Sequence, residues 1–147
     1  MKSLALILIL SAVASAQTVS PLNSEHSRKK IRGEFTLTND GLAPLAVTLE
    51  PMSLTFVDGK PVVTDLAPTT RVKLSEYSAS IGIKQIRTFM VNASCESDCV
   101  FIVFATMMTG HTASGVAIAT HVGTTVYACE KQRGCRESFL RQVKDTK

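Results

Sequence analysis

The chain has 147 residues, of which 45% are hydrophobic and 19% are charged, and its formal net charge is +4. This composition excludes a disordered chain and is typical of a packed globular protein, and the length suits one domain. The small positive charge identifies no class of partner.

Residues 1–16 have the pattern of a secretory signal peptide. Lys2 gives a short positive region, residues 4–10 are apolar, and Ala14 and Ala16 fit the small-x-small rule for cleavage. A bilayer-spanning helix needs about 20 apolar residues, so we favour cleavage over a retained anchor, and no later segment is long enough to span a membrane. We therefore expect a periplasmic or secreted protein.

The first strands of the domain are predicted from alternating polarity. Apolar and polar residues alternate in residues 31–38, which is typical of a half-buried antiparallel strand. Residues 18–27 before it are polar and predict an edge strand or a lead-in. After an Asn-Asp-Gly turn, a second alternating segment starts at Leu45 and is expected to end at Pro51. A basic cluster, which we interpret as a solvated strand start with no role in nucleic-acid binding, consists of Arg28, Lys29, Lys30 and Arg32.

Three further segments lead to the middle of the chain. Residues 54–63 contain an Asp-Gly pair between apolar residues, which predicts a second hairpin. Residues 69–74 predict another short strand, and residues 75–80 predict a polar loop.

Two apolar segments joined by a small polar loop form the centre of the predicted fold. Residues 87–93 alternate, and residues 100–105 are apolar at every position, which predicts a strand buried on both faces. The loop at residues 96–98 has a common hairpin length. We expect one shared core that contains Phe35, Leu37, Val47, Phe89, Val91, Ile102 and Phe104.

The last strand and a charged tail complete the chain. Residues 116–128 are rich in β-forming residues, whereas residues 130–147 are highly charged. Three apolar residues of this tail have helical spacing, so it can form a short helix, with a frayed tail as the alternative. Seven or eight short strands in residues 17–129 predict an all-β, immunoglobulin-like sandwich, and a small barrel is the alternative.

Four cysteines in an exported chain predict disulfide bonds. Of the three connectivities we favour Cys95–Cys99 and Cys129–Cys135, because each pair brackets a short polar loop. Directly opposite residues of an antiparallel pair have Cα atoms about 4.5–5.5 Å apart, within the disulfide range. The spacings also suit metal ligands, but no histidine lies close to either pair in sequence, so we favour disulfides over zinc.

The sequence contains no motif from which a nucleophile, a base and an orienting group can be assembled, so we expect no enzyme. His111 and His121, with Met107 and Met108, could form a soft copper site. Core packing accounts better for the methionines, and we expect neither a metal nor another cofactor. A glycosylation acceptor sequence starts at Asn92, which we attribute to chance because this residue lies in a predicted paired strand.

Four segments are spread over most of the chain after residue 16: FTLTNDG (35–41), RVKLSEYSASIGIKQIRTFMV (71–91), CVFIVFATM (99–107) and VAIATHVGTTVYA (116–128). In this order they resemble the N-terminal immunoglobulin-like domain of the periplasmic pilus-assembly (PapD-like) chaperones. The resemblance implies a PapD-like sandwich that binds a protein partner, such as a pilin or another envelope subunit, by strand pairing at the edge of a sheet.

The sequence departs from that family at the residues that capture the pilin. The chaperones hold the C-terminal carboxylate of a pilin between a basic residue on the first strand and a lysine on the last strand. The position of the lysine corresponds to Thr124, with Thr125 beside it, and residues 18–27 contain no Arg or Lys, so that Arg28 is the nearest cation. After residue 128 we expect only the charged tail in place of the family's second domain. The resemblance therefore implies a shared fold rather than transfer of pilin capture.

We expect an exported single-domain protein that acts as a chaperone-like or assembly-associated module through its last strand. The candidate edge residues are Val116, Ile118, Thr124 and Val126. The tail, tethered by the second disulfide, is expected to cover this edge, because an exposed edge favours aggregation. The alternatives are a structural spacer in an envelope complex and, less favoured, a copper or redox protein.

Overall fold

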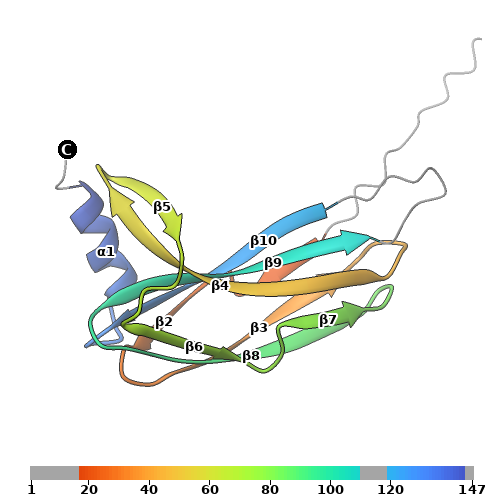
Figure 1. Cartoon of the computed structure of the whole chain (residues 1–147), viewed down its shortest axis with the longest axis horizontal. Coiled ribbons are helices and arrows are strands. Elements are labelled where there is room, and N and C mark those ends of the chain that lie inside the picture. Colours follow the sequence, from red (N-terminus) through yellow and green to blue (C-terminus); the bar gives the residue numbers. More distant parts are fainter. Residues whose placement is uncertain (1–16, 110–118, 145–147) are drawn as a thin grey trace, which may run out of the picture.

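The computed structural model describes residues 17–109 and 119–144, which form two packed β-sheets and one helix (Figure 1). The first sheet has the order β1-β3-β8-β6, with β1 Gln17–Ser20, β3 Ile31–Asn39, β8 Ile86–Cys95 and β6 Thr70–Leu74. The second has the order β2-β10-β9-β4-β5, with β2 Asn23–Ser27, β10 Ala119–Cys129, β9 Cys99–Thr109, β4 Leu45–Val57 and β5 Lys60–Thr64, and β7 (Ser78–Ile81) also pairs with β4. The helix α1 spans Cys135–Lys144. The predicted all-β sandwich is confirmed.

The core lies between the two sheets and is built from every second residue of the long strands. Phe35 of β3 is paired with Phe89 of β8, and their rings stack with centroids 5.4 Å apart. Five of the seven predicted core residues belong to this cluster. Its buried members are Ile31, Phe35, Leu37, Leu45, Val47, Leu49, Leu74, Ile81, Phe89, Val91, Cys95, Phe101, Val103, Ala105, Met107, Val126 and Ala128.

The prediction is wrong for Ile102 and Phe104. Phe101, Val103 and Ala105 face the core, so the alternation of side chains along β9 turns Ile102 and Phe104 to the outer face, where they are half-buried. A segment that is apolar at every position does not reveal which set of residues faces inward. The expectation that this strand is fully buried on both faces is wrong for the same reason.

Pro51 does not end its strand, because β4 continues through it to Val57. The N–H of Leu49 donates to the carbonyl of Tyr77 (2.8 Å), on the side of β4 away from β9. Pro51 lies two residues further on, so its missing N–H would point to that same side. There β7 pairs with β4 before Pro51 and β5 pairs with it after Pro51, so no ladder hydrogen bond is lost.

Two polar segments contain strands that their sequences did not clearly indicate. Residues 18–27 contribute to β1 in the first sheet and β2 in the second, where β2 pairs in parallel with β10. The predicted loop at residues 75–80 contains the start of β7. Both segments lie at sheet edges, where backbone pairing forms a strand without an apolar face.

The tail forms α1, which packs on the outer face of the second sheet. The disulfide Cys129–Cys135 joins β10 to the first turn of the helix, with Cα atoms 5.7 Å apart. The ring of Phe139 lies 6.1 Å from that of Tyr127, and together with Val100 these residues form a second, smaller apolar cluster. The structure also contains the other favoured disulfide, Cys95–Cys99, at the neck of the hairpin between β8 and β9.

Candidate protein-binding edge

β10 is interior to the second sheet along its C-terminal half. β2 pairs in parallel with residues 125–129, and β9 pairs with the opposite side of β10. The prediction that the whole last strand is an edge is therefore wrong for this half. The pairing uses backbone groups, so the polar side chains of β2 do not oppose it.

The N-terminal half of β10 has an open backbone edge. The N–H of Thr125 donates to the carbonyl of Leu22 (2.9 Å), on the side of β2. Backbone groups alternate in direction along a strand, so those of His121 and Gly123 point to the same side. No described residue pairs with them there. Residues 119–123 are thus paired with β9 on one side only, and the place beside them on the other side continues the line of β2.

Of the four predicted edge residues, two are buried and two lie outside the described residues. Thr124 is buried, and its hydroxyl donates to the carbonyl of Pro21 (2.7 Å). The side chain of Val126 lies in the core, and its strand position is flanked by β2 and β9. Neither side chain is available to a partner. Val116 and Ile118 lie outside the described residues.

The described part of the tail, residues 130–144, does not cover the open half of β10. The backbone N–H of Arg136 donates to the carboxylate of Glu25 (3.0 Å), and the side chain of Gln132 donates to the carbonyl of Glu25 (3.1 Å). These contacts place the tail beside β2, at the interior half of β10. The expectation that the tail covers the edge is wrong, because β2 already occupies the part of the edge that the tail can reach.

Two residues of the open half, Gly123 and His121, were not among the predicted edge residues. Gly123 lies under Ile102 and Phe104, and a Cβ at its position would be 2.7 Å from Cδ1 of Ile102. His121 is exposed, and its Nδ1 lies 3.1 Å from the hydroxyl of Thr106 on β9. The available sequence signal was the glycine in an otherwise β-rich segment.

Arg28 does not replace the basic anchors of the chaperone family. Its guanidinium forms an ion pair with the carboxylate of Asp98 (3.1 Å), and the same carboxylate oxygen accepts the N–H of Glu130 (3.0 Å). Arg28 thus joins the strand start to the hairpin loop and the tail, where it stabilises that end of the sandwich.

The side chains considered for copper binding are separated by the fold. Met107 is buried in the core, whereas Met108 and His121 are exposed, and His111 lies outside the described residues. Within residues 17–109 and 119–144 there is no group of three or more His, Cys, Asp or Glu side chains that could hold a metal ion. In the same residues no helix has the length and hydropathy needed to cross a bilayer.

No protein-family model matches the sequence, and no protein with curated annotation is similar to it in sequence. Solved structures, by contrast, share its architecture. WR4, a member of the MSP family of Caenorhabditis elegans, superposes with a TM-score of 0.57 at 10% identity over 78% of this chain and 99% of its own.

Bacterial fimbrial chaperones superpose equally well. The class 5 fimbriae chaperone CfaA gives a TM-score of 0.61 at 4% identity over 78% of this chain. The complex of the chaperone CsuC with the tip adhesion subunit CsuE of Acinetobacter baumannii gives a TM-score of 0.58 at 11% identity over 84% of this chain. The chain has a PapD-like fold. The matches cover only 56% and 64% of those two structures' chains, and at such low identity the PapD-like likeness establishes the fold alone.

Proposed function

We propose that this PapD-like domain is an exported, non-enzymatic binding module that adds a strand of a protein partner to the open half of β10. The observation that carries the proposal is the unpaired backbone of His121 and Gly123, in a strand whose other half is paired on both sides. An incoming strand would satisfy these groups and extend the line of β2.

The kind of partner is inferred from the structural neighbours. CsuC was solved in a pre-assembly complex with a tip adhesion subunit. By analogy, the partner of this chain is an envelope or secreted protein such as a pilus subunit, and the role is chaperone-like or assembly-associated. Export is supported by the signal pattern of residues 1–16 and by two disulfides, which persist in oxidising compartments.

The substitution His121→Pro tests strand addition directly. The N–H of His121 points away from β9, so proline removes a free donor and places its ring in the path of the incoming strand without breaking the β9–β10 ladder. We expect tagged wild-type protein to capture a specific partner from the exported proteins of the source organism, and His121→Pro to lose that partner.

The matched control is His121→Ala, which removes the same imidazole and its contact with Thr106 but keeps the backbone N–H. It should capture the partner as the wild type does. Equal capture by both variants would contradict strand addition at this edge and favour a rigid spacer. Circular dichroism and thermal melting of both variants should first establish that each is folded.

A further inference from the structure

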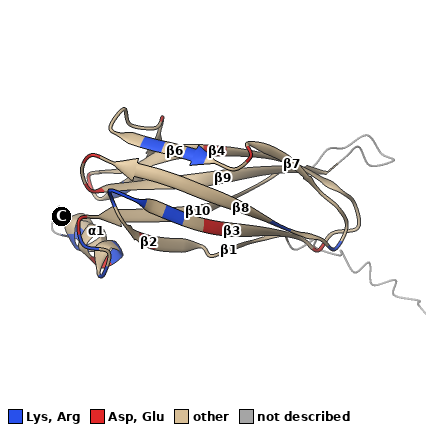
Figure 2. Cartoon of the chain, turned by 90° about the horizontal axis from the view of Figure 1, so that it is seen from below, with Lys and Arg blue, Asp and Glu red and all other residues tan. Residues whose placement is uncertain are grey.

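Three basic side chains gather on the outer face of the first sheet. Arg32 lies on β3, and Arg71 and Lys73 lie on β6 (Figure 2). The alternate residues of these strands face the core, as Leu74 does, so the three cations point to solvent. All three are exposed.

The strand register fixes the spacing of these charges. Asn92 of β8 is paired with Arg32 on one side and with Lys73 on the other, and Ser94 is paired with Arg71. Neighbouring strands lie about 4.8 Å apart, so the backbones of Arg32 and Lys73 are separated by about 10 Å, and those of Arg71 and Lys73 by about 7 Å. The cations form a triangle with an amide and a hydroxyl between them.

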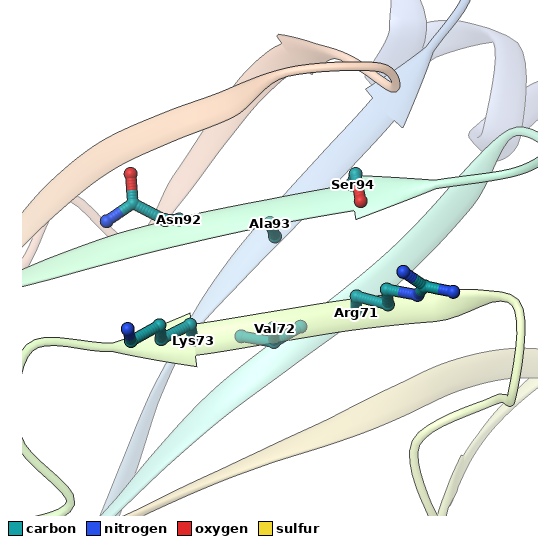
Figure 3. A pocket seen from close by; sticks show the side chains of 6 residues that line it. All are labelled: Arg71, Val72, Lys73, Asn92, Ala93 and Ser94. Atoms are coloured by element: carbon teal, nitrogen blue, oxygen red, sulfur yellow. The ribbon is translucent and has the colours of Figure 1, made fainter.

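The surface is hollowed between β6 and β8. In Figure 3 the side chains of Arg71 and Lys73 extend in opposite directions along β6, while Asn92 and Ser94 project from β8. The open depression has a volume of about 300 Å³ and is lined by Arg71, Val72, Lys73, Asn92, Ala93 and Ser94.

None of the three cations of this face forms an ion pair with a described acidic side chain, whereas Arg28 and Arg87 do. Glu34 shares the outer face of β3, two residues along the strand, where it is paired with Met90. The three cations lie on the half of the sheet nearer α1 (Figure 2), and with Glu34 as the acidic neighbour on β3 they leave an excess of positive charge that attracts anions.

The backbone edge of β6 is a poor site for an added strand. The N–H of Thr70 donates to the carbonyl of Ala67 (2.9 Å), and the N–H of Leu74 lies 3.4 Å from the hydroxyl of Tyr77. Of the three outward-directed N–H groups of β6, only that of Val72 is without a described partner. The backbone of β6 therefore offers a ligand little to bind, and a ligand here must be held by the side chains of the outer face.

We propose that this face binds an acidic polysaccharide. A protein partner needs an apolar anchor at the centre of its interface, but the centre here is Asn92 and Ser94. Arginine and lysine form charge-assisted hydrogen bonds with sulfate or carboxylate groups, and the amide and hydroxyl suit the sugar hydroxyls between those groups. The inference is independent of the strand-addition proposal, because it uses the other sheet.

The test compares a face variant with a charge-matched control, both produced in a host that does not glycosylate Asn92. The face variant carries Arg32→Glu, Arg71→Glu and Lys73→Glu. The control carries Lys60→Glu, Lys131→Glu and Lys144→Glu at exposed lysines outside this face. The probes are size-defined oligosaccharides of dextran sulfate and hyaluronan, with neutral dextran, anionic phosphatidylglycerol vesicles and a polyglutamate peptide for comparison.

We expect the wild type to bind at least one acidic oligosaccharide and not neutral dextran. The affinity of the face variant should be lower by a factor of about ten or more. The control should bind like the wild type. Asn92→Ala should weaken binding several-fold without a change of charge. The proposal would be overturned if the face variant and the control lost binding equally, or if the face variant bound the oligosaccharides as the wild type does. It would also be overturned if the vesicles or the peptide bound equally tightly at this face.

Discussion

At the scale of single residues, the two phenylalanines Phe89 and Phe104 illustrate how position on a strand decides a contribution to stability. Phe89 is 0% exposed and stacks on Phe35. Phe104 is also in a long apolar strand but lies half-buried on the outer face, over Gly123. The cost of removing each ring should follow this difference in burial.

We expect Phe89→Ala to lower the free energy of unfolding by about 3–5 kcal/mol, because it leaves a cavity between the sheets. Phe104→Ala should cost clearly less, since its ring is partly solvated in the folded protein. Urea denaturation of the two variants measures both values. A larger loss for Phe104→Ala than for Phe89→Ala would mean that β9 presents its other face to the core.

His26 makes stability depend on pH. It lies on β2, half-buried against Gly33 of β3, and this burial lowers the pKa of its imidazole below the ordinary value of 6.5, because burial disfavours the charged form. The unfolded chain therefore binds a proton near pH 6.5 that the folded chain does not. This contribution to stability is fully present above that pH and declines as the pH falls below it.

Denaturation curves between pH 8 and pH 5 should show this decline for the wild type. His26→Gln should make the curve flatter over that range, because the residue no longer titrates. If His26→Gln retains the full slope, another group is responsible for the pH dependence.

At the scale of elements, α1 protects the outer face of the second sheet. The helix is short and would be marginal in isolation, but the Cys129–Cys135 disulfide holds its first turn and Phe139 covers Tyr127 and Val100. The charged tail is therefore part of the fold. Its apolar residues are too few to form a core of their own and instead cover an existing apolar surface.

Deleting the chain from Arg136 onward should expose Tyr127 and Val100. We expect greater self-association, measured by sedimentation as a function of concentration, because the newly exposed surface is apolar. Phe139→Ser in the full chain should give a weaker effect in the same direction, and Arg141→Ser, on the solvated side of α1, should give none. Unchanged sedimentation after the deletion would contradict the assigned role of α1.

At the scale of the whole molecule, the two proposed binding surfaces lie on different sheets and use different chemistry. The open half of β10 in the second sheet offers backbone groups, and the basic face of the first sheet offers charged side chains. The core separates them, and no residue belongs to both. They should therefore act independently, as distant sites without shared partners usually do.

This independence is testable with the variants already described. His121→Pro should leave oligosaccharide binding unchanged, and the triple substitution at Arg32, Arg71 and Lys73 should leave capture of the protein partner unchanged. Each variant thus serves as the folded control for the other. A loss of both activities in either variant would indicate that the two surfaces form one site.

The sequence by itself determined the fold class, most of the core and the local pairing of the cysteines. Alternation of apolar residues is set by the two-residue period of a strand, so the inward faces of β3, β4 and β8 could be read from the sequence. The order of the resembling segments indicated the PapD-like arrangement. The strand faces and the cysteine pairing depend on neighbours that are close in the chain.

Only the tertiary structure decided which strands are edges. β2 and β7 are polar and form by pairing with distant strands. Pro51 is tolerated because neither β5 nor β7 pairs with it on the side of β4 away from β9. The side of β9 that faces the core depends on the opposite sheet, which a uniformly apolar segment does not encode. The open half of β10 and the triangle of cations likewise arise from pairing between strands far apart in the chain, since backbone hydrogen bonds are the same for every sequence and leave no pattern of residues.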